Sequence, residues 1–423
     1  TLRSRSALAQ LAGNRRKSCL CHVAHARCAP WHNAGLSARL RIPFLAVPHT
    51  RQQTCEQTAH RLRDNLPRLG TKRALVGLDG FVDEIITVVD KRTGHDAYSP
   101  IRTIADLAKK MQAAAGQSSN YELVVRQMKL GGNGPIMANA LASLGVAVTY
   151  IGNLGYPTIH PVFDDLAQRA EVVSIGQPAH TDALEFEDGK LMLGKLEPLS
   201  EVTWDNLLSR VGREKLGAMI GRSDLVAMVN WTMLPHMSRI WAKLLDEFVP
   251  DADRHARFVF IDLADPEKRT HDDIVDALRL LTRFQDQVDV VLGLNLKESQ
   301  EIAEVLGLPG RSDPEPLIQS TAEAIRQKLG LACVVIHPRR GAAAATVEES
   351  ATFAGPFIPH PKISTGAGDH FNAGFCLGRM LGMSLEQCLC AGCATSGYYV
   401  RTAQSPTAAE LADFIEQLPP PQG

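Results

Sequence analysis

The stretch Val288-Asp-Val-Val-Leu-Gly-Leu-Asn-Leu-Lys-Glu-Ser-Gln-Glu-Ile-Ala-Glu-Val-Leu306 joins two patterns that decide the fold class. Its first part, up to Leu294, is a nearly continuous apolar run, which is typical of a β-strand covered on both faces. From Leu296 onward, apolar residues recur at the spacing of an amphipathic helix, which predicts a helix to Leu306. A buried strand that leads directly into a helix is the repeating unit of an α/β fold.

The same alternation extends over most of the chain. Further strands are predicted at Arg73 to Leu78, Val146 to Ile151, Glu171 to Ile175, Asp224 to Trp231, Arg257 to Leu263 and Ala332 to His337. Helices are predicted at Gly134 to Leu144, Thr203 to Ile220, Met237 to Phe248, His271 to Phe284 and Asp313 to Leu329. We therefore predict an α/β protein with a three-layer, doubly wound, mainly parallel sheet, whose ligands bind at the carboxyl ends of the strands.

A second group of strands does not fit this alternation. Ala183 to Leu193 alternates apolar and polar residues about Asp188-Gly189, which is a strong β-hairpin signal. Glu84 to Val89 and Tyr121 to Leu130 are also strand-like, and they flank a polar helical insert near Ile101 to Ala115. We predict a small β-sheet that serves either as a lid over a site or as a cover for a sheet edge.

The charge of the chain is balanced but unevenly distributed. The 423 residues carry 45 Lys+Arg and 46 Asp+Glu, a net charge of -1, which argues against a nucleic-acid or membrane-surface role. No apolar run reaches the roughly 18 residues that span a bilayer. Residues 1–55 contain nine basic side chains and no acidic one. We interpret them as a basic leader, which is a transit-like segment for organellar import, a disordered tail or an artefact of where the chain starts.

The domain organisation follows from these patterns. We expect residues 72–418 to form a single domain, with lid segments near 84–130 and 180–195, and residues 419–423 to form a loose tail. Cysteines outside the leader lie in apolar helix or strand contexts, where Cys acts as a small hydrophobic residue. They fit a reducing compartment, so we expect a cytoplasmic protein unless the leader directs import into an organelle.

The turn Ser364-Thr365-Gly366-Ala367-Gly368-Asp369 runs straight into a predicted helix that begins Phe371-Asn-Ala-Gly374. Such a turn presents unpaired backbone N–H groups at the positive end of the helix dipole, where phosphate groups bind. Taken alone, Asp369 has two interpretations. It caps the helix, or it is a general base that takes a proton from an attacking hydroxyl group.

Three motifs occur in a fixed order along the chain. Gly131-Gly132 opens a helix of small residues that ends at Leu144-Gly145, Asn295-Leu-Lys-Glu298 follows a strand, and Thr365 to Asp369 forms the glycine turn. In these motifs the sequence resembles the ribokinase-like carbohydrate kinase family, also called the PfkB family, from about Arg73 to Leu418. The resemblance implies a core with a β-sheet lid, ATP-dependent phosphorylation of an alcohol, and Mg²⁺ as cofactor.

The resemblance also implies roles for the motif residues. Asp369 would be the base that acts on the acceptor hydroxyl, and the backbone of Gly366, Ala367 and Gly368 would hold the developing phosphoryl charge. Asn295 and Glu298 would organise Mg²⁺ and its waters around the nucleotide phosphates. The alternative for this last pair is a loop Asn followed by a Glu that the helix dipole favours in the first turn.

In this family an Asp just after the first strand binds the hydroxyl groups of the acceptor. Both Asp79 and Asp83 are candidates, and we favour Asp79 because it lies nearer the end of the predicted strand. A carboxylate accepts hydrogen bonds from two hydroxyl groups, which suits a sugar. Gly131, Gly132 and Asn133 would line the same pocket, where missing side chains let the acceptor approach the backbone.

Some positions depart from the family pattern. Ile363 stands where the family usually has Asp, and Ile136 stands where it commonly has Asn. After the strand that ends near His337, the family often has Thr-x-Gly at the nucleotide phosphates, whereas this chain has His337-Pro-Arg-Arg-Gly341.

The segment that replaces Thr-x-Gly contains candidate nucleotide contacts. We expect Gly341, together with Thr365 of the glycine turn, to lie at the nucleotide site. Arg339 or Arg340 either replaces a backbone phosphate cradle with a charged side chain or is a solvated loop residue. These departures leave the acceptor open.

We therefore predict an ATP-dependent kinase that acts on a hydroxyl group of a sugar or nucleoside, a small molecule. The alternative is a catalytically inactive sensor of the same fold, which Ile136 and His337 favour. The sequence contains no P-loop, no His-Glu-x-x-His zinc motif and no complete dinucleotide fingerprint. Lids of this family often pair between subunits, so a homodimer through the lid is also expected.

Overall fold

The structure, a computed structural model, describes residues 50–248, 257–310 and 312–421. They belong to one compact unit, His49–Gly423. The predicted leader, residues 1–55, lies outside the described residues except for its last part, which forms the beginning of helix α1 (Arg51–Asn65). None of the helices in the described ranges is both long enough and apolar enough to cross a membrane.

Helix α1 packs against the C-terminal helices α12 (Leu385–Thr402) and α13 (Ala408–Glu416). Thr50 and Gln53 form a capping box at its start, and Cys55 and Leu62 are buried in the core. The folded unit therefore begins before the predicted boundaries at residues 55 and 72. The reason is that the helices that cover the buried face of α1, α12 and α13, lie near the other end of the sequence.

The main sheet has nine strands in the order β14-β13-β12-β11-β10-β9-β1-β5-β6. Every strand predicted for this sheet is confirmed, with these bounds: β1 Arg73–Leu78, β5 Ala147–Gly152, β6 Glu171–Ser174, β9 Leu225–Val229, β10 Phe258–Asp262, β11 Asp289–Leu294 and β12 Cys333–Ile336. Within this group, neighbouring strands are parallel to one another. The antiparallel pair β13 (Gly341–Ala345) and β14 (Ser350–Ala354), which the sequence did not predict, extends the sheet beyond β12.

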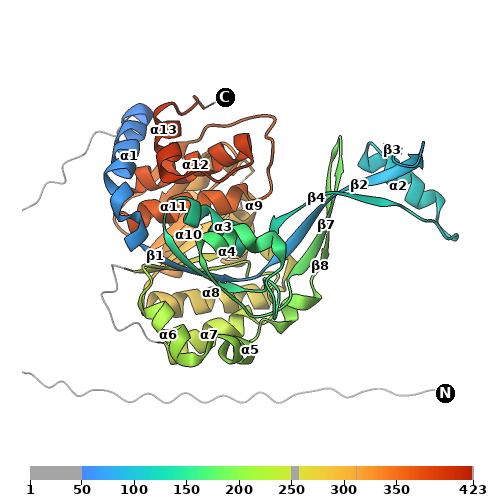
Figure 1. Cartoon of the computed structure of the whole chain (residues 1–423). Coiled ribbons are helices and arrows are strands. Elements are labelled where there is room, and N and C mark those ends of the chain that lie inside the picture. Colours follow the sequence, from blue (N-terminus) through green and yellow to red (C-terminus); the bar gives the residue numbers. More distant parts are fainter. Residues whose placement is uncertain (1–49, 249–256, 311, 422–423) are drawn as a thin grey trace, which may run out of the picture. The chain divides into compact units, whose positions relative to one another are not determined.

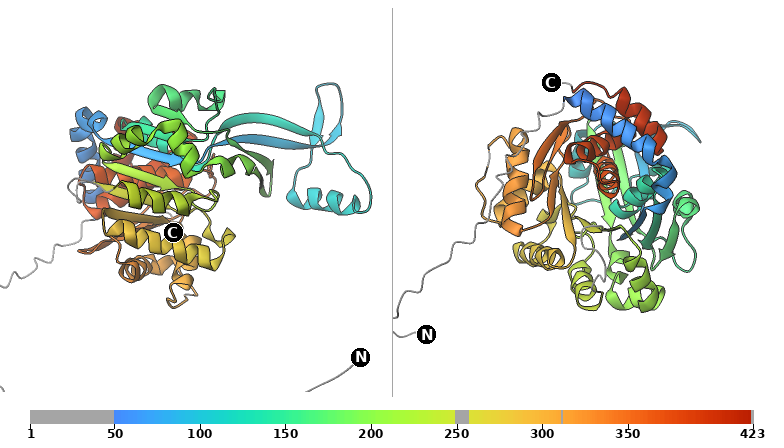
Figure 2. Two further views of the ribbon diagram at one scale, coloured as in Figure 1. Left: turned by 90° about the horizontal axis from the view of Figure 1, so that it is seen from below. Right: turned by 90° about the vertical axis from the view of Figure 1, so that its left-hand side faces the viewer.

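Helices cover both faces of this sheet (Figures 1 and 2). Neighbouring residues of β1 show the two faces, because Ala74 and Val76 enter one hydrophobic core and Leu75 enters the other. The first core contains α1, α4 (Asp164–Arg169), α12, α13, α3 (Asn133–Ser143) and α11 (Ala367–Met380). The second contains α5 (Trp204–Val211), α6 (Arg213–Gly221), α7 (Met237–Glu247), α8 (His271–Gln285), α9 (Leu296–Val305) and α10 (Ile318–Leu329). This is the predicted three-layer arrangement.

Two predicted helices differ from the observed ones. The helix expected from Thr203 to Ile220 is divided into α5 and α6 at Gly212, whose φ of 85° lies in the left-handed region and interrupts the helix. The helix expected from Asp313 begins only at Ile318, after a short 3-10 turn that contains Pro316.

A second sheet of five strands confirms the predicted small sheet (Figure 1). It contains β2 (Phe81–Arg92), β3 (Tyr98–Pro100), β4 (Leu123–Gly131), β7 (Ala179–Phe186) and β8 (Gly189–Lys195). Strands β7 and β8 form the hairpin predicted about Asp188-Gly189, and helix α2 (Ile104–Ala113) is the predicted insert. The Asp188 carboxylate accepts a hydrogen bond from the Ile104 N–H at 2.7 Å, which ties the hairpin tip to the start of α2.

Candidate active site

The glycine turn leads into α11, and Gly366 precedes the helix with a φ of 86°, a left-handed conformation that favours glycine. The Ala367 N–H donates to the Ser364 carbonyl at 3.2 Å. In the described part of the chain, no main-chain carbonyl accepts from the N–H groups of Gly368 or Asp369. Main-chain carbonyls therefore leave these two amides to an anion at the positive end of the helix, although the Asp369 N–H also contacts its own carboxylate.

Asp369 lies in the first turn of α11 and is 5% exposed. Asn133, the first residue of α3, donates a hydrogen bond from Nδ2 to Asp369 Oδ1 at 3.0 Å. Burial raises the pKa of Asp369 well above its usual value, and the neighbouring charge of Asp262 raises this pKa further. The structure thus brings the predicted Gly131-Gly132-Asn133 segment to the predicted base, in a site where that base readily takes up a proton.

Asp79 is fully buried after β1, and both of its carboxylate oxygens are held by the protein. Oδ1 accepts from the Gly134 N–H at 2.9 Å, and Oδ2 accepts from Asn230 Nδ2 at 2.7 Å. The Tyr150 hydroxyl donates to the main-chain oxygen of Asp79. Burial raises the pKa of Asp79 to about 6. This carboxylate joins the end of β1 to the start of α3 and to the residue that follows β9.

Asp83 lies on the lid strand β2, where it is paired with Lys129 of β4 and Thr181 of β7. Its carboxyl group lies directly against Gly131, since a Cβ atom on Gly131 would be 2.4 Å from Asp83 Cγ. Burial raises the pKa of Asp83. Ile85, two residues along β2, and Lys129 both line a cavity between the lid and the core.

That cavity has a volume of about 1520 Å³. On the core side it reaches Ser364 of the glycine turn and His370 and Tyr399 behind it. The Tyr399 hydroxyl donates to the Thr365 carbonyl at 3.1 Å, and the Tyr399 ring stacks on His370 with ring centroids 3.6 Å apart. The lid-side cavity thus ends at the same turn that carries Asp369.

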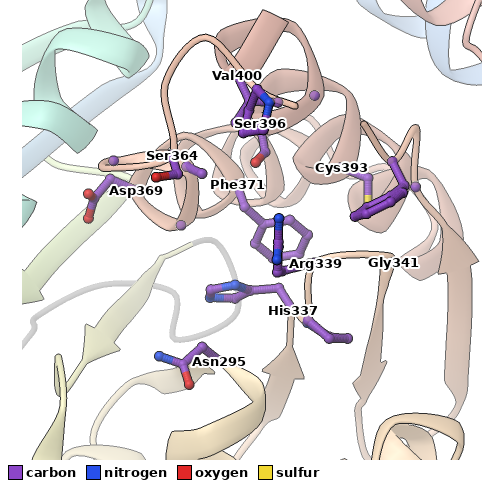
Figure 3. Close-up of a pocket in the computed structure, with 18 of the residues that line it drawn as sticks. Asn295, His337, Arg339, Gly341, Ser364, Asp369, Phe371, Cys393, Ser396 and Val400 are labelled. Atoms are coloured by element: carbon purple, nitrogen blue, oxygen red, sulfur yellow. The ribbon is translucent and has the colours of Figure 1, made fainter. Parts of the chain in front are cut away.

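A second cavity of about 470 Å³ lies on the other side of the turn, at the carboxyl ends of β10, β11 and β12 (Figure 3). The predicted site residues that line it are Asn133, Asn295, Glu298, Arg339, Gly341, Gly366, Ala367, Gly368 and Asp369. Thr365, Asp79, Asp83, Gly131 and Gly132 do not line this cavity. The Thr365 carbonyl is instead the acceptor for Tyr399.

Asn295 and Glu298 form a capping box at the start of α9. Asn295 Oδ1 accepts from the Glu298 N–H at 3.0 Å, while the Glu298 carboxylate accepts from the N–H groups of Asn295 and Asp265 at 2.8 and 2.9 Å. The pair therefore caps α9, with Glu298 in its first turn as in the alternative interpretation, and it also lines the cavity. Burial, followed by the charge of Asp262, raises the pKa of Glu298 to about 8.

Asp262 at the end of β10 completes this group of acids. Its oxygens accept from Asn372 Nδ2 at 2.7 Å and from the Ala264 N–H at 2.9 Å. Burial raises the pKa of Asp262 to about 6. Asp262, Glu298 and Asp369 all line the cavity, and the charge of Asp262 raises the pKa values of Glu298 and Asp369, so acidic groups gather on this wall.

The residues around the two arginines form the opposite wall. The guanidinium carbons of Arg339 and Arg340 lie 5.7 and 4.9 Å from the centre of the Phe357 ring, and only Arg339 lines the cavity. Sequence reasoning missed one face of α12 that also contributes to this wall: Cys393, Ser396, Gly397 and Val400. Their spacing places them on one helix face, and that regularity is the signal that could have found them.

Comparison with known proteins agrees with this architecture. A family model described as prokaryotic ketohexokinase matches residues 51–418. A ketohexokinase of Haloferax volcanii is 29% identical over 368 residues, which cover 86% of this chain and 96% of that protein. A ribokinase of Arabidopsis thaliana, solved with ribose and ATP, aligns with a TM-score of 0.56 at 15% identity and covers 81% of this chain and 98% of its own. An adenosine kinase of Sinorhizobium meliloti aligns with a TM-score of 0.55 at 18% identity, over 82% of this chain and 98% of its own.

Proposed function

Because the chain belongs to the prokaryotic ketohexokinase family and is a carbohydrate kinase, we propose that it transfers the γ-phosphoryl group of ATP to a hydroxyl group of a ketohexose. The observation that carries this proposal is the position of Asp369. Its buried carboxyl group stands beside two available backbone amides, on a turn that separates two cavities. The lid-side cavity would hold the sugar, and the cavity beside α12 would hold the nucleotide.

The chemistry of the transfer then follows from the turn. Asp369 accepts the proton of the attacking hydroxyl, and Asn133 fixes the orientation of the carboxylate through Oδ1. The N–H groups of Gly368 and Asp369 stabilise the negative charge that develops on the transferred phosphoryl group. The raised pKa of Asp369 suits this role, since a base with a higher pKa takes up a proton more readily.

The acidic wall of the nucleotide cavity fits Mg²⁺. Asp262 and Glu298 present hard carboxylate oxygens whose pKa values are raised by burial, and a bound cation would relieve their repulsion. These two residues, with Asn295 as the cap that orients Glu298, would hold the ion through its waters. When bound, Mg²⁺ would neutralise charge on the nucleotide phosphates.

The geometry favours Asp83 as the acid that binds the hydroxyl groups of the sugar, although Asp79 is nearer the end of β1. Asp79 already uses both oxygens for protein donors, whereas Asp83 lies on the lid against Gly131. Asp83 does not itself line the lid-side cavity, but its strand neighbour Ile85 and its cross-strand partner Lys129 do, so lid closure would bring a sugar held there toward Asp83 and Asp369.

A panel of ketohexoses, aldohexoses and nucleosides tests the proposal, with ATP as donor and ADP formation as the readout. We expect rapid turnover only with ketohexoses, and ³¹P NMR of the product identifies the phosphorylated oxygen. Turnover of a nucleoside with none of a ketohexose would overturn the assignment of the acceptor. Binding of sugar and ATP without ADP formation would instead identify the inactive sensor.

A further inference from the structure

His337 follows β12, at the position where the phosphates of a nucleotide would enter. Its N–H donates to the Leu294 carbonyl at 3.0 Å, which fixes its backbone beside the end of β11 and next to Asn295. The imidazole lines the nucleotide cavity. In Figure 3 it projects into the space between Asn295 and Phe371.

The ring is held in place by packing on one side. It lies on the Phe371 ring of α11, with centroids 4.6 Å apart and planes inclined by 30°. Phe371 in turn is confined by α12, because a Cβ atom on Gly392 would lie only 2.8 Å from its ring. The imidazole therefore has a fixed orientation and little freedom to turn away from the cavity.

The other side of the ring faces the glycine turn. A Cβ atom on Gly368 would lie 3.3 Å from His337 Cε1, so the ring edge lies directly beside the turn that has available amides. The neighbouring ring atom, Nε2, is buried and forms no hydrogen bond within the described part of the chain. A buried polar atom without a partner is costly to the fold, so its place beside an anion site points to a partner that the ligand supplies.

On the basis of the proposed kinase function, we propose that His337 binds the nucleotide polyphosphate by donating an Nε2–H hydrogen bond to an oxygen of the β- or γ-phosphate. Burial lowers the pKa of His337 to about 4, so the imidazole is neutral near pH 7 and carries a single ring proton; in the tautomer with that proton on Nε2, it donates a hydrogen bond without adding a charge. The nearby carboxylates would hold Mg²⁺ in the proposed site, and a neutral donor would not compete with them for the cation. His337 thereby takes the place of the hydroxyl donor that Thr-x-Gly would supply.

Binding measurements without an acceptor test this proposal, and they do not depend on which sugar is phosphorylated. We expect His337→Ala to weaken the binding of ATP and ADP about 10- to 100-fold, as for the loss of a hydrogen bond to a charged group. Binding of adenosine and AMP should stay within about twofold of wild type. His337→Gln, whose amide can donate near the same place, should recover part of the loss, and the exposed control His60→Gln should bind ATP like wild type.

Two results would overturn the proposal: unchanged ATP binding in His337→Ala, or equal losses for adenosine and ATP, which indicate that the ring only packs against Phe371. If the alanine variant melts at a much lower temperature than the wild type, a measurement on the wild-type protein tests the contact instead. With ¹⁵N-labelled histidine, a non-hydrolysable ATP analogue should shift the Nε2 resonance of His337, and adenosine should not. If the analogue leaves the chemical shift of the Nε2 resonance unchanged, the contact does not form and the proposal is wrong.

Discussion

Asp369 is the residue whose chemistry is easiest to isolate, because Asn matches its shape but does not accept the proton. We expect Asp369→Asn to lower kcat about 10²- to 10⁴-fold, with small changes in KM for ATP and for the ketohexose. The fold should tolerate the change, since burial already favours the uncharged form of this side chain. Steady-state kinetics and thermal melting check both expectations, and near-normal turnover would show that another group takes the proton.

Asp79 and Asp83 have different surroundings, which predict opposite effects of the same substitution. Asp83→Asn should raise KM for the ketohexose about 10-fold or more and leave the melting temperature near that of wild type. Asp79→Asn should instead destabilise the fold by about 1–3 kcal/mol, because its new NH₂ group would face donors from Gly134 or Asn230. Kinetics and denaturant unfolding of both variants distinguish them, and the reverse pattern would assign the sugar to Asp79.

His370 predicts a dependence of stability on pH. Burial lowers the pKa of His370 to about 4, below the value of 6.5 in an unfolded chain. Between these values the unfolded chain binds more protons, so the contribution of His370 is fully present above pH 6.5 and is lost as the pH falls toward 4. Relative to His370→Gln, the wild-type free energy of unfolding should therefore fall by about 2 kcal/mol more between pH 7 and pH 5. If the free energies of unfolding of the wild type and of His370→Gln, measured in urea, change with pH in parallel, this prediction is wrong.

At the scale of elements, the sequence predicts those strands and helices whose burial follows a regular pattern. The parallel strands are continuous apolar runs, and the lid hairpin has Asp188-Gly189 at its turn. By contrast, β13 is largely a run of alanines, Ala342 to Ala345, which has little β preference and is held as a strand by pairing with β12. Among the site residues, the motifs located the glycine turn. Local sequence does not show which of the two nearby acids, Asp79 or Asp83, has its carboxylate occupied by hydrogen bonds from the protein itself.

Helix α1 was not predicted because its buried face contains Thr54, Cys55, Thr58 and Ala59, which give little hydrophobic pattern. Leu62 is the exception, and it is fully buried against the C-terminal helices. We expect Leu62→Ala to lower the free energy of unfolding by about 2–5 kcal/mol, whereas the exposed control Gln52→Ala should have almost no effect. Equal stability of the two variants in denaturant unfolding would show that α1 is not an integral part of the kinase unit.

At the scale of the whole molecule, the lid exposes apolar side chains on both of its edge strands, β4 and β8. Met128 of β4 and Leu193 of β8 lie in one cross-strand row through Glu84 and Asp182 and are 53% and 50% exposed, and Met128 also lines the edge of the lid-side cavity. Exposed apolar side chains on both edge strands of a sheet favour pairing with a second sheet, so we propose that two chains associate through their lids.

Light scattering after size exclusion should therefore give the mass of a homodimer at micromolar concentration. The double variant Met128→Glu and Leu193→Glu should elute as a monomer, because two charges on each lid would be buried without partners at the interface. Gln300→Glu, a charge introduced on the exposed surface of α9, should remain dimeric. A wild-type protein that stays monomeric would exclude pairing through the lids.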